Sequence, residues 1–166
     1  MSKIWVTSDH HFGHENIIRY CGRPFKTARM MQKELIRKYN ERVGKDDIVY
    51  FLGDVTMKGR EGLSELRKII GQMNGTKHLI LGNHDYMRAF DYVEAGFMTV
   101  HTALDAEGFV MVHDPVASIV VPDRQVLCGH VHGLWKSSGN CLNMSVDVWD
   151  FYPVSLEDIK EYFKEA

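Results

Sequence analysis

Five short clusters of histidine, aspartate and asparagine stand out in this 166-residue sequence. They are Asp9-x-His11, Gly53-Asp54, Gly82-Asn83-His84-Asp85, His113-Asp114 and Gly129-His130-Val131-His132. Carboxylates, imidazoles and amide oxygens bind first-row divalent ions, and none of the clusters contains a cysteine. The residue types therefore predict a metal site built from distant parts of the chain. We expect Gly53, Gly82 and Gly129 to let the backbone turn sharply and come close to a ligand.

The first and last clusters each hold two polar residues separated by one position. Side chains alternate between the two faces of a strand, so we expect Asp9 and His11 to point the same way. His10 would point to the other face, where it is predicted to pack in the interior or beside the ligands. The same spacing predicts that His130 and His132 face the same way and reach two adjacent ions.

Each cluster follows a short apolar run that is typical of a buried strand. The runs cover residues 3–8, 47–53, 77–82, 109–113 and 127–129. Apolar residues recur at helical spacing over 27–43, 60–73 and 155–163, with Thr27 as the expected first cap and Ser155 with Asp158 as a capping box. This order of elements predicts an α/β layered sandwich. The clusters would gather at strand carboxyl ends, where open α/β sheets place their sites.

Composition and charge narrow the class of protein. With 45% hydrophobic and 25% charged residues, we expect one globular domain over residues 1–166. A formal net charge of −2 offers no large basic surface, although a nucleotide or a nucleic-acid end stays open as a substrate. No apolar run is long enough to cross a bilayer and no signal peptide is recognisable, so we expect a cytoplasmic protein without a membrane partner. The cysteines Cys21, Cys128 and Cys141 are expected to be reduced thiols.

The order D-x-H, GD, GNHD, H and GHxH resembles the calcineurin-like metallophosphoesterase superfamily. Two further stretches, FGHENIIRYCGRPF (12–25) and LNMSVDVWDFYPVSLEDI (142–159), are similar to a small single-domain branch of it found in bacteria and their phages. The resemblance implies a four-layer αββα sandwich, with two mixed sheets flanked by helices and a metal site at strand carboxyl ends. It also implies a metal-dependent phosphoesterase, which is a hydrolase acting on ester bonds.

The resemblance further implies which residues hold which ion. One ion would be held by Asp9, His11, Asp54 and His132, and a second by Asp54, Asn83, His113 and His130, with Asp54 bridging the two. The expected cofactors are two divalent metal ions, Mn²⁺ first, with Fe, Ni, Co or Zn as alternatives. The ions would bring more positive charge than the two aspartates return, so the centre could bind phosphate oxygens. A metal-bridging hydroxide would attack, and catalytic His84 would protonate the leaving oxygen.

One stretch departs from the superfamily's phosphoprotein phosphatases, which carry GDxxDRG and GNHE. Here the corresponding residues read GDVTMKG (53–59) and GNHD, so the acid that would orient the catalytic histidine is missing. Asp85 or a backbone group could orient His84 instead, and the sequence leaves this open. The departure favours a phosphodiesterase acting on a nucleotide or a nucleic-acid end. The alternatives are a phosphomonoesterase on nucleotides or other small phosphates, and a non-catalytic scaffold that keeps the fold for binding.

Several residues outside the clusters are candidates for contact with the substrate. His14, Arg19 and Arg23 follow the first ligands closely, and the arginines would suit the non-reacting phosphate oxygens. The alternative for this stretch is a solvated loop that packs through residues 24 and 25. Trp135 could stack on a base, but partial burial is the favoured expectation. The residues do not predict an oligomeric state.

Overall fold

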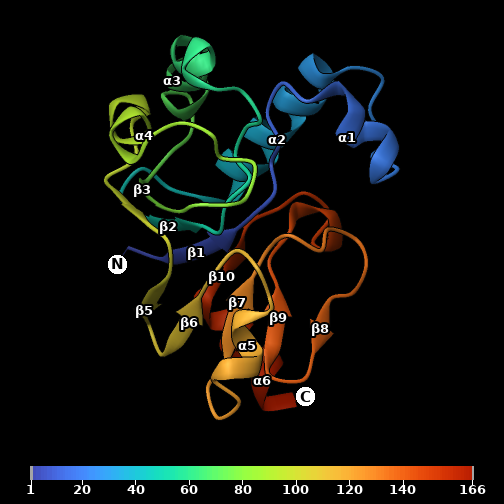
Figure 1. Ribbon diagram of the computed structural model, residues 1–166, viewed down its shortest axis with the longest axis vertical. Helices are drawn as coiled ribbons and strands as arrows, with labels where there is room; N and C mark the ends of the chain where they lie inside the picture. The colour runs from blue at the N-terminus through green and yellow to red at the C-terminus, as the bar shows by residue number, and fades with distance from the viewer. Residues whose placement is uncertain (1, 166) are drawn as a thin grey trace.

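The computed structural model describes residues 2–165, which form two five-stranded sheets (Figure 1). The first sheet has the strand order β10-β1-β2-β3-β4. Its strands are β1 (Ile4–Thr7), β2 (Ile48–Phe51), β3 (Thr76–Ile80), β4 (Thr99–His101) and β10 (Val154–Ser155). Strands β1 to β4 pair in parallel and β10 pairs antiparallel with β1, so the sheet is mixed.

The second sheet has the strand order β5-β6-β7-β9-β8 and is also mixed. Its strands are β5 (Leu104–Ala106), β6 (Phe109–Met111), β7 (Val126–Cys128), β8 (Ser137–Ser138) and β9 (Cys141–Asn143). The central pairs β6-β7 and β7-β9 are parallel, and the two edge strands are antiparallel to their neighbours. In Figure 1 this sheet lies below the first, with its strands under β1.

Helices flank the two sheets. They are α1 (Glu15–Tyr20), α2 (Ala28–Arg42), α3 (Leu63–Ile70), α4 (Ala89–Ala95), α5 (Ala117–Val120) and α6 (Leu156–Glu165), with 3₁₀ turns at Arg60–Gly62 and Val146–Val148. Helices α2, α3 and α4 pack on the first sheet, and α5 packs on the outer face of the second. This confirms the predicted four-layer αββα sandwich of two mixed sheets. Among residues 2–165, no helix has the length and apolarity needed to cross a membrane.

Strand β2 is buried on both faces because its residues alternate between two apolar clusters. Val49 and Phe51 belong to the cluster beneath the helices of the first layer. Tyr50 and the following Leu52 belong to the cluster between the two sheets, which also contains Ile159 of α6. A strand that is buried on both faces must be apolar throughout, which accounts for the continuous apolar runs in the sequence.

The three predicted helices form, with small changes at their ends. Helix α2 begins after Thr27, whose Oγ1 accepts a hydrogen bond from the backbone N–H of Met30. The helix predicted over residues 60–73 is a 3₁₀ turn followed by α3, which ends at Ile70. Helix α6 begins after Ser155, whose hydroxyl accepts a hydrogen bond from the backbone N–H of Asp158.

The turns that follow β1, β2 and β7 carry three of the five clusters of polar residues. Strand β1 ends at Thr7, so the predicted strand alternation does not align the side chains of residues 9 and 11. Instead, left-handed φ angles between +48° and +73° are found at Asp9, His11, Asp54, His130 and His132. Residues other than glycine rarely adopt this conformation, and where they do they often lie at functional sites. Tight turns, rather than extended strands, bring these side chains together.

Candidate metal centre

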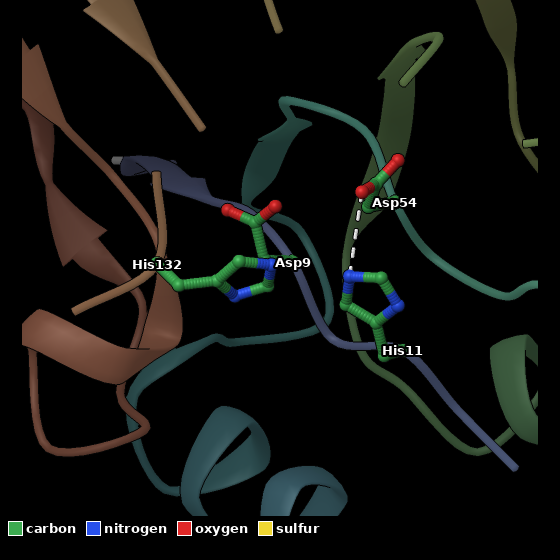
Figure 2. A group of neighbouring side chains, drawn as sticks. All are labelled: Asp9, His11, Asp54 and His132. Atoms are coloured by element: carbon green, nitrogen blue, oxygen red, sulfur yellow. Dashed lines mark ion pairs between the residues drawn. The ribbon is translucent and has the colours of Figure 1, made fainter. Parts of the chain in front are cut away.

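Asp9, His11, Asp54 and His132 meet at the carboxyl ends of the strands, although they come from three distant parts of the chain. Each offers one ligand atom, and these four atoms all lie within 4.8 Å of one another. Figure 2 shows the two carboxylates and two imidazoles close together, with His11 paired to Asp54. The Nε2 atom of His11 lies 3.3 Å from Oδ2 of Asp54. This donor set suits a first-row divalent cation.

A second set of donors surrounds the other carboxylate oxygen of Asp54. The Nε2 atom of His113 lies 3.4 Å from Oδ1 of Asp54 and 2.9 Å from Oδ1 of Asn83. The Nδ1 atom of His130 lies 2.9 Å from the same Asn83 oxygen and 3.3 Å from Nε2 of His113. The structure thus brings together all seven side chains predicted as ligands: Asp9, His11, Asp54, Asn83, His113, His130 and His132. Their binding of metal stays a prediction.

Glycines at the strand ends permit this close packing. A Cβ atom added to Gly82 would overlap Oδ1 of Asp54. One added to Gly129 would lie 2.8 Å from Oδ2 of Asp9. Any other residue at either position would therefore push a carboxylate out of place. Gly53 is restricted in the same way, by the ring of His113 and the backbone of Gly82. The close approach of these glycines to a bound ligand stays a prediction.

The charge states of His11 and Asp54 fit cation binding. Burial lowers the pKa of His11, so the ring is neutral and can offer a lone pair. Within residues 2–165, neither ring nitrogen of His11 makes a hydrogen bond of normal geometry, which is uncommon for a buried imidazole. Burial alone would raise the pKa of Asp54, but the nearby imidazoles of His11 and His113 outweigh it and hold the pKa well below its usual range. A divalent cation would satisfy both the carboxylate and the imidazole.

Asp147 orients the side chain of His132, and the sequence analysis did not single it out. Its Oδ2 lies 2.8 Å from Nδ1 of His132. Burial alone would lower the pKa of His132, but the hydrogen bond to Asp147 outweighs it and raises the pKa to about 10. Near neutral pH the metal-free ring therefore carries a proton on both nitrogens. A cation would have to displace the proton on Nε2, while Asp147 keeps the one on Nδ1, as in carboxylate–histidine–metal arrangements. The thiol of Cys21 lies beside this pair, within 4.8 Å of a ligand atom of each.

Arg23 is buried beneath the metal ligands, in contrast to its predicted contact with the substrate. Its guanidinium donates to both carboxylate oxygens of Asp147, at 2.7 and 2.9 Å. It also donates to the backbone carbonyls of Asp9 at 2.7 Å and His10 at 3.1 Å. The substrate prediction for Arg23 is therefore wrong: the side chain holds the turn that carries the first ligands. Arg23 and Asp147 lie 124 positions apart, so no local spacing could have linked them.

His84 lies beside both donor sets. Its ring centroid is 5.6 Å from that of His11, and its backbone N–H donates to Oδ1 of Asp54 at 2.9 Å. Its Nδ1 atom lies 2.9 Å from the hydroxyl oxygen of Tyr86. Asp85 has a different role, because its carboxylate accepts hydrogen bonds from three backbone N–H groups that follow β2 and β3. The partner of His84 is therefore a tyrosine, which the sequence analysis did not consider.

A cleft of about 890 Å³ opens beside the ligands. His14 lines this cleft, and its ring centroid is 5.4 Å from that of His11. Arg19 is exposed outside the cleft lining and donates a hydrogen bond to Oδ1 of Asn16 at 2.9 Å. The substrate roles of His14 and Arg19 stay predictions, and only His14 has a side chain that faces the cleft.

Two aromatic residues near the centre have packing roles. The ring of His10 is 2% exposed, and its centroid lies 5.1 Å from those of both Phe12 and Phe51. Burial, more than the nearby charges, lowers the pKa of His10 to about 3, so the ring is neutral. Trp135 is half-buried against the cluster on the outer face of the second sheet. Both favoured packing expectations are confirmed.

Comparison with known proteins identifies the family. The calcineurin-like phosphoesterase family matches residues 2–163. A Methanocaldococcus jannaschii protein described as uncharacterized, MJ1445, is 34% identical over 175 residues, which cover 100% of this chain and 94% of that protein. The gene 66 protein of Mycobacterium phage D29 is 35% identical over 85 residues, covering 51% of this chain and 41% of the phage protein. The chain belongs to the calcineurin-like phosphoesterase family, a class of metal-dependent hydrolases of phosphate esters.

Two solved structures share the fold. The AQ665 protein of Aquifex aeolicus, described as of unknown function, superposes with a TM-score of 0.76 at 23% identity, covering 98% of this chain and 100% of that chain. The nuclease MPE of Pseudomonas putida superposes with a TM-score of 0.52 at 22% identity, covering 78% of this chain and 61% of that chain. At these identities the likeness concerns the fold alone.

Proposed function

We propose that the protein hydrolyses phosphodiesters at a centre of two divalent metal ions, and that its substrate is a nucleotide or a nucleic-acid end. The observation that carries the proposal is the convergence of two donor sets on the two carboxylate oxygens of Asp54. A carboxylate shared in this way is what a closely spaced pair of ions needs. Mn²⁺ is the first metal we expect, with Fe, Ni, Co and Zn as alternatives, because all accept oxygen and imidazole donors.

Within this proposal, the side chains divide into ion ligands and a proton donor. Asp9, His11 and His132 complete one ligand set, and Asn83, His113 and His130 complete the other, with Asp54 common to both. When bound, the ions would lower the pKa of a water molecule and neutralise phosphate oxygens. His84, held by the Tyr86 hydroxyl at the edge of both sets, donates a proton to the leaving oxygen.

The chemistry of the cleft supports a diester over a monoester. A phosphate monoester carries close to two negative charges near neutral pH, because its second pKa is about 6, whereas a diester carries one. The cleft lining, all of it within residues 2–165, contains no lysine or arginine. The second negative charge of a monoester would therefore be neutralised by the metal ions alone. The fold shared with a nuclease, an enzyme class that cleaves phosphodiesters, adds support.

Hydrolysis of bis-p-nitrophenyl phosphate and of p-nitrophenyl phosphate tests the proposal. Protein stripped of metal by a chelator is assayed before and after Mn²⁺ is restored. We expect turnover only with the metal, and a higher kcat/KM for the diester than for the monoester. An Asp54→Asn protein prepared in parallel controls for a contaminating phosphatase, because it should be inactive in the same assay.

The other outcomes assign the alternatives. A higher kcat/KM for the monoester would identify a phosphomonoesterase with the same ligands. No turnover of either ester, with Mn²⁺ or with Ni²⁺, would contradict the proposal and favour a non-catalytic scaffold.

A further inference from the structure

The cleft beside the metal centre has apolar walls that the proposed chemistry does not use. Ile17 and Tyr20 of α1 contribute to one wall, Leu134 of the loop after β7 contributes to another, and Met57 also lines the space. Tyr20 is 71% exposed and Leu134 is 78% exposed. Large apolar side chains exposed beside a catalytic centre suggest a surface that the substrate covers.

This lining restricts the chemistry of the substrate beyond its reacting phosphate. Within the described residues, the cleft has no lysine or arginine that could hold a second phosphate. A polyphosphate chain or a long nucleic-acid backbone would therefore gain no charge-assisted contacts there. A planar apolar group, in contrast, would bury the exposed face of the Tyr20 ring.

The polar atoms at the rim favour a heteroaromatic ring over an alkyl chain. Asn16 lines the same wall as Tyr20, and its carbonyl oxygen is taken by Arg19. Because this oxygen accepts from Arg19, the amide N–H₂ group is the part of the side chain that could donate to a ring nitrogen or a carbonyl oxygen. An aromatic face next to an amide donor matches a nucleobase, whose faces stack and whose edges accept hydrogen bonds.

We propose that Tyr20 and Asn16 on one wall of the cleft and Leu134 on another form a nucleoside-binding subsite, and that the substrate is a small nucleoside phosphodiester whose base stacks on Tyr20. This inference rests on the proposed phosphodiesterase function and narrows it. Recognition acts through the base and the one reacting phosphate, so it does not require further phosphates. Stacking is tolerant of base identity, so the subsite accepts both purines and pyrimidines.

Two diesters with the same leaving group isolate this subsite. Thymidine 5′-(p-nitrophenyl) phosphate and methyl p-nitrophenyl phosphate release the same phenol from the same type of phosphate, and they differ only in the retained group. We expect the Mn²⁺-loaded enzyme to have a kcat/KM at least about 10-fold higher for the thymidine ester, because stacking of one base on an aromatic side chain commonly changes binding by that factor or more. In Tyr20→Ala this ratio should fall toward one, mainly through KM.

Matched variants separate stacking from a change in the fold. Tyr20→Phe keeps the ring and should keep most of the ratio. Phe90→Ala removes another exposed aromatic residue, 68% exposed on α4 outside the cleft, and should keep the wild-type ratio. Equal kcat/KM values for both esters in the wild-type enzyme would contradict the subsite but leave the proposed function intact. The same holds if Tyr20→Ala keeps the wild-type ratio. If the wild-type enzyme hydrolyses neither ester, the proposed function fails and this inference fails with it.

Discussion

The Nδ1 atom of His84 lies 2.9 Å from the hydroxyl oxygen of Tyr86, so a tyrosine contacts this ring where the sequence left Asp85 or a backbone group as candidates. A phenol is neutral near pH 7, so it orients the imidazole through a hydrogen bond alone, without the ion pair that a carboxylate would add. Asp85 is committed elsewhere, to backbone N–H groups beneath the ligands. With Nδ1 held by the phenol, Nε2 is the nitrogen left to carry the proton in the proposed mechanism.

Replacement of the Tyr86 hydroxyl should slow proton donation without loss of metal. For Tyr86→Phe we expect kcat to fall by about 10-fold with poor leaving groups, since general acid–base catalysis as a whole contributes about 10²–10⁴-fold and the variant loses only the orientation of the acid. The loss should shrink for p-nitrophenol, which needs little protonation. The measurement is kcat across a series of aryl methyl phosphates, with metal content determined in the same samples.

A matched control for this variant is Tyr152→Phe, which removes a hydroxyl that bonds to Glu41 on the surface. In this variant kcat should depend on the leaving group as it does in the wild-type enzyme. An equal loss for all leaving groups in Tyr86→Phe, or a loss of bound metal, would show that Tyr86 does not act through His84.

The pairing of His132 with Asp147 predicts an effect on both metal affinity and stability. In Asp147→Asn the acceptor that keeps a proton on Nδ1 of His132 is weakened, so we expect metal affinity to fall about 10- to 100-fold. The change also leaves the buried guanidinium of Arg23 without its counter-charge, which should reduce the free energy of unfolding by about 3 kcal/mol. Metal titration followed by calorimetry, and urea unfolding of the metal-free protein, measure the two effects.

Asp150→Asn makes the same chemical change three residues away, at a side chain that is 79% exposed and paired with Lys38. Because exposed ion pairs contribute little, this variant should keep wild-type metal affinity and stability. Equal behaviour of the two variants would contradict the assigned role of Asp147.

Much of the site could be predicted because its ligands follow directly from the strands. The sheets bring the carboxyl ends of β1, β2, β3 and β7 together, so polar residues just beyond each end must meet there. Strand alternation does not align Asp9 with His11, because β1 ends at Thr7. Their left-handed φ angles bring the side chains together. Asp and His adopt this conformation more often than most non-glycine residues, but an isolated sequence does not show at which positions they do so.

The residues that support the ligands were not predictable in the same way. Arg23 and Asp147 meet only in the folded chain, and an arginine near ligands in sequence has the same signature whether it faces the cleft or the interior. Burial decides between the two, and burial depends on how α2 closes over the first turn. Tyr86 lies next to the GNHD motif, but whether its hydroxyl reaches His84 depends on the turn before α4.

The shared position of Asp54 predicts that its removal affects both ions. In Asp54→Asn we expect kcat/KM for a diester to fall by more than about 100-fold, a larger loss than is typical for residues outside the ligand set. Metal content after dialysis against Mn²⁺ should fall below one ion per chain. Asp46→Asn, at an exposed position before β2, is the matched control. Retention of two ions in Asp54→Asn would rule out the bridging role.

The buried neutral ring of His10 predicts loss of stability in mild acid. Burial lowers its pKa to about 3, so between pH 6.5 and pH 3 the unfolded chain binds a proton at this residue that the folded chain does not. The contribution of neutral His10 to the free energy of unfolding is therefore fully present above pH 6.5. It is lost as the pH falls from 6.5 toward 3. Proton linkage predicts that the free energy of unfolding falls by about 2 kcal/mol between pH 7 and pH 5 because of this residue. A bound cation nearby would oppose protonation of the folded state further, so the sign does not depend on metal.

Urea unfolding of the metal-free protein at pH 7, 6 and 5 measures this dependence, and His10→Phe isolates the residue. The phenyl ring keeps aromatic packing against Phe12 and Phe51 but cannot titrate. Overpacking should lower the free energy of unfolding of the variant by about 1–3 kcal/mol at all three pH values. The slope with pH is the informative quantity, because the other histidines titrate equally in both proteins. The variant should lose about 2 kcal/mol less than wild type between pH 7 and pH 5, and identical slopes would show that His10 takes up its proton in the folded state.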